Sequence, residues 1–124
     1  MKKKMIIIGG GISGIYLSIL LKKYLDMDVV VLEANDKPLK KLLATGNGRC
    51  NLSNKDLDKA HYDGDIKPWV NDIIHDFDIV EALKDIGLYT KYMGNLLYPY
   101  SESAKAVQTL FLNRAEEYGV KIIC

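Results

Sequence analysis

Three glycines with a regular spacing follow the first apolar run of the chain. They form Gly9-x-Gly11-x-x-Gly14, directly after Met5–Ile8. In this pattern the first glycine permits a tight turn, the second lets a diphosphate approach the backbone, and the third lets a helix pack closely on a strand. Backbone N–H groups and the positive end of the helix dipole then bind the anion. The residues that we expect at this diphosphate site are Gly9, Gly11, Ile12, Ser13 and Gly14.

An acidic residue ends the second apolar run. Glu33 follows Val29–Leu32 and lies 19 residues after Gly14, the spacing expected for a carboxylate that accepts hydrogen bonds from ribose hydroxyls. Its negative charge disfavours a 2′-phosphate, so FAD or NAD fits this site better than NADP. The alternatives without a ligand are a turn-rich glycine loop and a solvated carboxylate.

A basic, glycine-bearing stretch runs from Lys37 to Asn54. It reads as an irregular, flexible loop with many short hydrogen-bonding side chains. Since it begins just after the predicted ribose carboxylate, it can fold over the nucleotide and flank its phosphates. Arg49 can pair with a phosphate or with a carboxylate. The alternative is an ordinary surface loop with Asn-Gly turn chemistry.

These groups need a framework of strands and helices. Met5–Ile8 and Val29–Leu32 are typical of strands buried on both faces, and helical spacing runs from Ile12 to Leu25. The order strand–helix–strand is the parallel unit of α/β proteins. Ser18, one turn after Gly14, is small enough to continue the close packing of the helix.

Residues 55–124 predict further helices, a hairpin and a third strand. Pro68 opens a helix expected to bury Trp69, Val70, Ile73, Ile74 and Phe77. Asp78 and Glu81 predict a capping box for a short helix ended by Gly87. Gly94-Asn95 predicts a hairpin between Tyr89–Met93 and Leu96–Tyr98. Ser101 or Ser103 caps a longer helix, Gly119 ends it, and Val120–Cys124 begins a strand.

We therefore expect one α/β domain over residues 1–124. Residues 1–36 hold the strand–helix–strand unit with its glycines, residues 37–54 the loop, and residues 55–124 the remaining elements. In a parallel sheet a strand is normally followed by a connection that covers one face. Because nothing follows the third strand, we expect the chain to be truncated.

Composition excludes several classes. The chain has 124 residues, 48% hydrophobic, and a net charge of +1, which favours neither nucleic acid nor a membrane surface. Glycines interrupt the only long apolar stretch, so we expect no secretory signal or membrane anchor. Two cysteines form no disulfide framework, a composition that predicts a reducing cytoplasm, and Cys50 has no nearby thiol for dithiol chemistry. His61 and His75 are isolated and Asp63-Gly64-Asp65 reads as a turn, so no metal site is expected.

At this point a resemblance becomes specific. Gly9-Gly10-Gly11-Ile12-Ser13-Gly14, Val31-Leu32-Glu33 and, above all, Lys41-Leu42-Leu43-Ala44-Thr45-Gly46-Asn47-Gly48-Arg49-Cys50-Asn51 resemble the N-terminal part of a bacterial family of NAD(P)/FAD-dependent oxidoreductases. That family includes aminoacetone oxidase-like and 3-dehydro-bile-acid Δ4,6-reductase-like flavoproteins. The later Tyr98-Pro99-x-Ser101 and Gly119-Val120 also match its pattern.

The resemblance implies a Rossmann-type, glutathione-reductase-like FAD-binding fold, of which this chain is the N-terminal portion. Gly9, Gly11, Gly14 and Glu33 would bind the adenosine diphosphate half of FAD. The residues implied near the ribitol and flavin are Lys41, Thr45, Gly46, Gly48, Arg49, Cys50 and Asn51.

The function that follows is hydride transfer between FAD and a small organic substrate, with NAD(P)H as a candidate electron donor. No side chain stands out as a general acid or base. We therefore expect the 124 residues alone to be inactive, with a missing C-terminal part of the enzyme as partner. The alternatives are a non-catalytic nucleotide-binding fragment and an NAD-dependent dehydrogenase.

Overall fold

The computed structural model describes residues 1–57, 62, 64 and 68–124. Contacts between Cα atoms separate the chain into two compact units, the first made of residues 1–50 and 101–124 and the second of residues 51–100. The expectations for His61 and for the turn at Asp63 and Asp65 lie outside the described residues.

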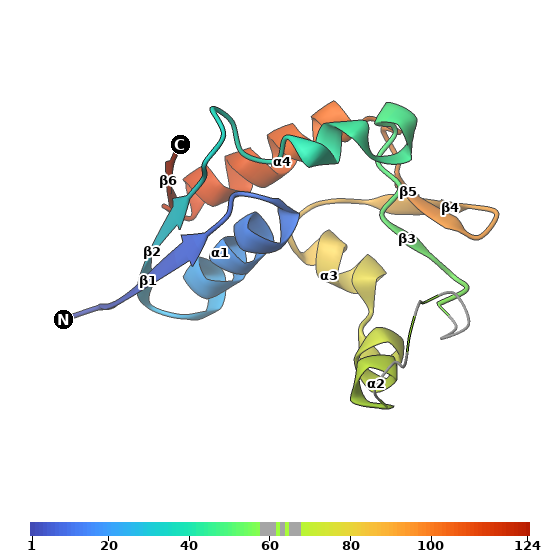
Figure 1. Cartoon of the computed structure of the whole chain (residues 1–124), viewed down its shortest axis with the longest axis horizontal. Coiled ribbons are helices and arrows are strands. Elements are labelled where there is room, and N and C mark those ends of the chain that lie inside the picture. The colour runs from blue at the N-terminus through green and yellow to red at the C-terminus, as the bar shows by residue number, and fades with distance from the viewer. Residues whose placement is uncertain (58–61, 63, 65–67) are drawn as a thin grey trace. The chain divides into compact units, whose positions relative to one another are not determined.

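The first unit is built on a parallel sheet of three strands (Figure 1). Its order is β1 (Lys3–Ile8), β2 (Met27–Leu32), β6 (Lys121–Ile123). Helix α1 (Ile12–Tyr24) connects β1 to β2. The register aligns Ile7 with Val31 and Val31 with Ile122. The predicted strand–helix–strand unit and third strand are thus confirmed, and the fold is a Rossmann-like α/β fold.

The core of this unit lies on one face of the sheet. Figure 1 shows α1 and α4 (Ala104–Glu117) on the same side of the strands. The Tyr16 and Phe111 rings meet edge to face, with their centroids 6.2 Å apart. Ser18 is buried, and its hydroxyl donates to the Ile15 carbonyl one turn earlier in α1 at 2.6 Å, so this polar side chain is satisfied within the helix. The other buried side chains of this core include Ile7, Ile15, Ile19, Val29, Val31, Val107, Phe111 and Ala115.

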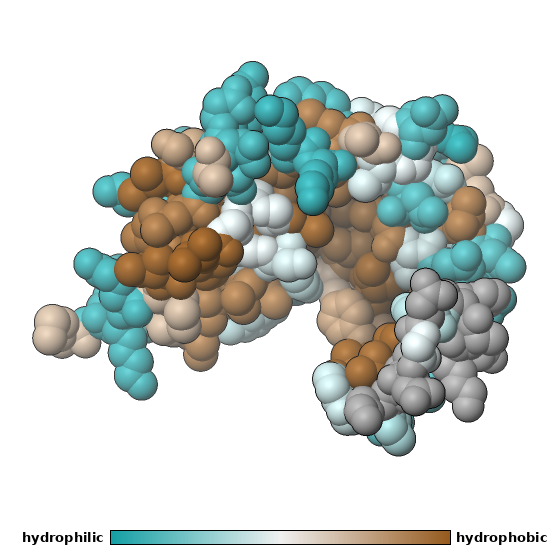
Figure 2. Space-filling view, in the orientation of Figure 1, coloured by the Kyte–Doolittle hydropathy of each residue, from teal (hydrophilic) through white to brown (hydrophobic). Residues whose placement is uncertain are grey.

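The opposite face of the sheet is open. Ile8 is 88% exposed and Ile6 and Leu32 are also exposed, and Figure 2 shows hydrophobic residues gathered over β1 and β2. The expectation that these strands are buried on both faces is therefore wrong. Successive side chains point to opposite faces of a strand, and both helices cover the same face.

The second unit holds an antiparallel sheet in the order β3 (Ser53–Asn54), β5 (Leu96–Pro99), β4 (Thr90–Met93). Met93 pairs with Leu96 around Gly94 and Asn95, which confirms the predicted hairpin. Helices α2 (Pro68–Asp76) and α3 (Ile79–Asp85) belong to the same unit. The Asp78 carboxylate accepts the Glu81 N–H at 3.1 Å, so Asp78 is the predicted N-cap.

The sequence predicts that the apolar stripe of α2 is buried, but in the structure it is not. Trp69 is 62% exposed, and Ile73 and Phe77 are also exposed. A helical apolar pattern shows which side chains share a face but not whether another element covers that face. Leu17 and Tyr24 of α1 also belong to an apolar helical pattern and are also exposed, because no element of the described chain covers them.

Helix ends in the first unit follow the sequence signals. Ser103, not Ser101, caps α4, and its hydroxyl accepts the Ala106 N–H at 3.2 Å. Gly119 has a positive φ of 76° after the helix, a conformation that costs glycine little. None of the helices in the described part of the chain has the length and apolarity needed to span a membrane.

Adjacent isoleucines of β1 test this one-sided core. Ile7 is 9% exposed. We expect Ile7→Ala to lower the free energy of unfolding by about 2–4 kcal/mol, because it removes buried methylene groups and leaves a cavity. Ile8→Ala is the matched control on the open face and should cost less than about 0.5 kcal/mol. Denaturant unfolding of both variants measures the difference, and equal losses would mean that the two faces are equally covered.

Candidate nucleotide-binding site

The glycine turn connects the end of β1 to α1. Gly9 has a φ of 106°, which a residue with a side chain rarely adopts, and its N–H donates to the Leu32 carbonyl at 2.7 Å. A Cβ at Gly14 would collide with the Gly9 carbonyl oxygen, whereas a Cβ at Gly11 would meet nothing within 4 Å. The turn therefore packs tightly at its third glycine and leaves open space at its second, which a diphosphate requires.

The N-terminus of α1 offers donors to this space. Gly11 is the N-cap, no side chain caps it, and the first turn contains no acidic residue. The first N–H groups of a helix have no partner within the helix, and they carry the positive end of its dipole. Lys22 and Lys23 lie in the last turn, where positive charge is favourable. The N-terminus of α1 therefore suits an anion, and Ile12 and Ser13 are exposed at that end.

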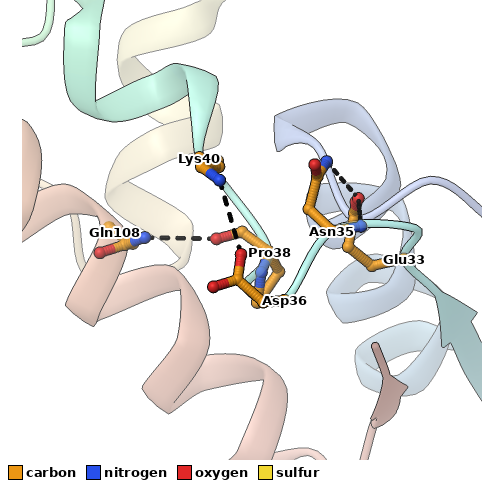
Figure 3. Close-up of polar contacts among 6 residues, drawn as sticks. All are labelled: Glu33, Asn35, Asp36, Pro38, Lys40 and Gln108. Carbon is orange, nitrogen blue, oxygen red and sulfur yellow. Dashed lines mark hydrogen bonds and ion pairs between the residues drawn. The ribbon is translucent and has the colours of Figure 1, made fainter.

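Glu33 directs its carboxylate toward the glycine turn. One oxygen accepts the Gly10 N–H at 2.6 Å. The other accepts the backbone N–H and the side-chain amide of Asn35 at 2.9 and 2.8 Å, and Figure 3 shows Asn35 beside the carboxylate. The two bonds from Asn35, followed by the bond from Gly10, hold the pKa of Glu33 below its ordinary value. The carboxylate is therefore ionised at neutral pH, and in this form both of its oxygens accept hydrogen bonds and neither donates.

These groups share one edge of the sheet. Gly9 follows β1 and Glu33 follows β2, and the two strands are parallel neighbours. The Glu33 N–H also donates to the Ile123 carbonyl of β6 at 2.8 Å. In open α/β sheets ligands bind outside the carboxyl ends of the strands. The structure thus brings the first group of predicted residues together at the expected edge.

The second group of predicted residues, between Lys41 and Asn51, lies in a segment with a helical backbone rather than in an irregular loop. Lys41–Gly48 form η1, a 3-10 helix interrupted at Thr45, Gly46 and Asn47. Gly46, Asn47, Gly48 and Cys50 all have positive φ. The segment closes on itself, since Thr45 donates through its hydroxyl to the Leu42 carbonyl at 2.6 Å and accepts the Cys50 N–H at its own carbonyl at 3.0 Å. The expected irregular loop is therefore corrected to a short helix with a left-handed turn.

The side chains of this segment have different surroundings. Lys41 is exposed, and an Arg49 Nη1 atom lies 3.6 Å from a Glu102 carboxylate oxygen, so the structure shows the carboxylate partner that the sequence allows. Cys50 is fully buried, and burial raises the pKa of its thiol above the ordinary value although a hydrogen bond with Thr45 acts in the opposite direction. Asn51 begins the second unit.

The connection between the two groups runs through Leu39. Its N–H donates to the Gly10 carbonyl at 2.8 Å, and η1 begins two residues later. Contact of either group with a cofactor stays a prediction.

Over residues 1–57, 62, 64 and 68–124, no three His, Cys, Asp or Glu side chains cluster as a metal site would need.

Sequence reasoning missed four residues that shape the site. Gly10 lies between the motif glycines, and a Cβ there would come within 2.8 Å of the Glu33 carboxylate. Asn35 and Leu39 carry no pattern that marks their contacts. Gln108 gives the one usable signal, since it lies among the apolar positions of α4 and is buried.

Fold and site define the first unit as a Rossmann-type α/β unit in which an uncapped helix N-terminus lies beside a carboxylate. Residues 3–124 match the model of the HI0933-like protein Rossmann domain. The chain belongs to this family, which confirms the oxidoreductase-type resemblance carried by its motifs.

Two curated relatives match most of the chain. The 3-dehydro-bile acid delta(4,6)-reductase of Clostridium scindens is 38% identical over 120 residues, or 94% of this chain. The ribosomal RNA dihydrouridine synthase of Haemophilus influenzae is 29% identical over 123 residues, or 95% of it. The chain spans only 29% and 30% of the length of these relatives. The solved structure of Thermovibrio ammonificans THI4 has the same fold, with a TM-score of 0.63 at 16% identity, over 98% of this chain and 38% of that one.

Two glycines of one turn should respond differently to alanine. We expect Gly14→Ala to lower the free energy of unfolding by about 2–3 kcal/mol, because its Cβ forces the helix away from the strand. Gly11→Ala is the matched control, since Gly11 has a φ of −75° that alanine adopts easily and open space around its Cα. Its cost should stay below about 1 kcal/mol. Equal destabilisation in thermal and denaturant unfolding would contradict the difference in packing.

The two cysteines should differ in reactivity. Cys50 is buried with a raised pKa, whereas Cys124 is exposed. Because the thiolate is the reacting species, we expect a disulfide reagent to modify Cys50 at least about 100-fold more slowly than Cys124 in the folded chain. Cys124→Ser should remove the fast phase, and denaturant should make Cys50 fully reactive. Rapid modification of Cys50 in native Cys124→Ser protein would show that its burial is transient.

Proposed function

We propose that this chain is the FAD-binding portion of a flavin-dependent oxidoreductase that transfers hydride to or from a small organic molecule. The observation that carries the proposal is the ionised Glu33 carboxylate on the Gly10 N–H, beside the open space at Gly11. This arrangement provides donors for a diphosphate and an acceptor for the adjoining ribose. NAD(P)H is the proposed electron donor.

The residues present fit FAD. The N-terminus of α1 would hold the diphosphate, and Glu33 would accept hydroxyl groups of the adenosine ribose. The segment Lys41–Asn51 would flank the ribitol and flavin, with Arg49 as its positive side chain. FAD, when bound, supplies a ring that accepts or donates hydride. The chain's own residues bind and orient the cofactor, and none is proposed as a general acid or base.

The names of the relatives support a role in cofactor binding rather than in substrate choice. One is named for a bile acid and the other for ribosomal RNA, yet both match nearly all of this chain. A portion shared by proteins with such different substrates is best explained by a common cofactor. The net charge of +1 also disfavours an RNA surface on this portion. We therefore expect the 124 residues to bind FAD without turnover.

Calorimetric titration of the 124-residue chain tests this proposal. We expect FAD to bind at least about 10-fold more tightly than NAD, a difference of about 1.4 kcal/mol. Gly11→Ala should weaken FAD binding by at least about 10-fold, because its methyl group enters the space for the diphosphate while the fold is retained. Asn113→Ala, an exposed change on α4, is the control and should leave affinity unchanged.

The outcomes separate the alternatives. Tighter binding of NAD than of FAD would favour an NAD-dependent dehydrogenase. Binding of neither nucleotide by well-folded protein would reject the nucleotide site itself. Catalytic oxidation of a reduced nicotinamide by the 124-residue chain with FAD would contradict the expectation that this portion binds the cofactor without catalysis.

A further inference from the structure

A buried amide supports the segment that follows Glu33. Gln108 is 4% exposed, and a buried amide is costly unless it forms hydrogen bonds. Its nitrogen donates to the Pro38 carbonyl at 3.2 Å, across 70 residues of sequence (Figure 3). Its oxygen accepts the Lys105 ammonium at 2.9 Å. Lys105 thereby orients the amide so that its donor faces Pro38.

The supported backbone leads directly to the glycine turn. Leu39 follows Pro38, is buried, and has a φ of 59°, a conformation that a residue with a side chain keeps only where its surroundings enforce it. Its N–H donates to the Gly10 carbonyl at 2.8 Å, while the Gly10 N–H donates to Glu33 at 2.6 Å. The residue Gly10 is therefore held on both sides by the segment Glu33–Leu39.

We propose that Gln108 is a positioning residue of the nucleotide site. By donating to Pro38 it holds Leu39 in its left-handed conformation, and Leu39 in turn holds Gly10 against the Glu33 carboxylate. The effect on nucleotide affinity rests on the proposed function, whereas the effect on the Gly10 backbone does not. A purely structural glutamine would instead stabilise α4 without selective influence on Gly10 and Leu39.

Hydrogen exchange in the ligand-free 124-residue chain tests the positioning role directly. Gln108→Leu keeps the bulk of the side chain but removes the donor, and we expect the Leu39 and Gly10 amides to exchange about 10-fold faster, the equivalent of one lost hydrogen bond. The amides of Val31 and Phe111 should exchange as before. Thr109→Ala, an exposed change on the same helix, is the control. Equal acceleration of all four amides, or of none, would overturn the proposal.

Two further variants keep the test from resting on Gln108→Leu alone. Gln108→Glu, measured at a pH where its carboxylate is ionised beside Lys105, cannot donate to Pro38, so it should accelerate the same two amides. Lys105→Ala changes an exposed residue and removes only the group that orients the amide, so a smaller acceleration, about 2–3-fold, is expected. Exchange at Leu39 and Gly10 that is unchanged in both variants would contradict the role of the Gln108 donor.

A double-mutant cycle with Glu33→Gln tests the connection to the nucleotide. Gln108→Leu should weaken FAD binding about 10-fold in the wild-type background and less than about 2-fold in the Glu33→Gln background. The reason is that the effects of substitutions at residues that act through one another are not additive. Additive losses would overturn the proposal that Gln108 affects nucleotide affinity through the contact between Gly10 and Glu33. If the unchanged chain binds no FAD, the proposed function fails, and hydrogen exchange still decides the positioning role.

Discussion

The hydrogen bond from the Gly10 N–H to the Glu33 carboxylate, at 2.6 Å, is the contact on which the rest of the site depends. It joins the ends of β1 and β2, beside the bond from the Gly9 N–H to the Leu32 carbonyl. It requires glycine at position 10, because a Cβ there would contact the carboxylate. It also directs a negative charge toward the N-terminus of α1, which is favourable for that end of the helix dipole. The glycine turn and the acidic residue therefore form one electrostatic arrangement rather than two neighbouring motifs.

Backbone strain is concentrated in the segments that flank this arrangement. Leu39, Asn47, Cys50 and Glu102 have positive φ although they carry side chains. Leu39 and Cys50 are fully buried, so packing of their side chains offsets part of the conformational cost. Glu102 lies beside Arg49, which adds an ion pair between the two flanking segments. Such positions persist only where surrounding contacts determine them. Gln108 of α4 donates to the carbonyl that precedes Leu39, and the Thr45 carbonyl of η1 accepts the Cys50 N–H.

The fold was largely predictable because its signals are local. Apolar runs ended by glycine or by Glu33, cap residues and the Gly94-Asn95 turn predict β1, α1, β2, the hairpin and the ends of α3 and α4 within one or two residues. Exposure was less predictable. Ile8 and Trp69 belong to apolar patterns, but a pattern does not tell whether a second layer covers it. The contact between Gln108 and Pro38 spans 70 residues, so no local rule could predict the partner, although a glutamine among the apolar positions of α4 does signal a buried amide.

The same hydrogen bonds that orient Glu33 couple the turn to protonation. Because the bonds from Asn35 and Gly10 favour the charged carboxylate, its pKa is lower in the folded chain than in the unfolded chain. A group of this kind contributes stability above its unfolded pKa, about 4.3 for glutamate, and loses that contribution as the pH falls through its folded pKa. Near neutral pH the carboxylate is charged and accepts the Gly10 N–H. Protonation would weaken this bond and would also weaken the acceptor that the proposed nucleotide needs for its ribose, so one protonation state serves both the closed turn and the proposed site.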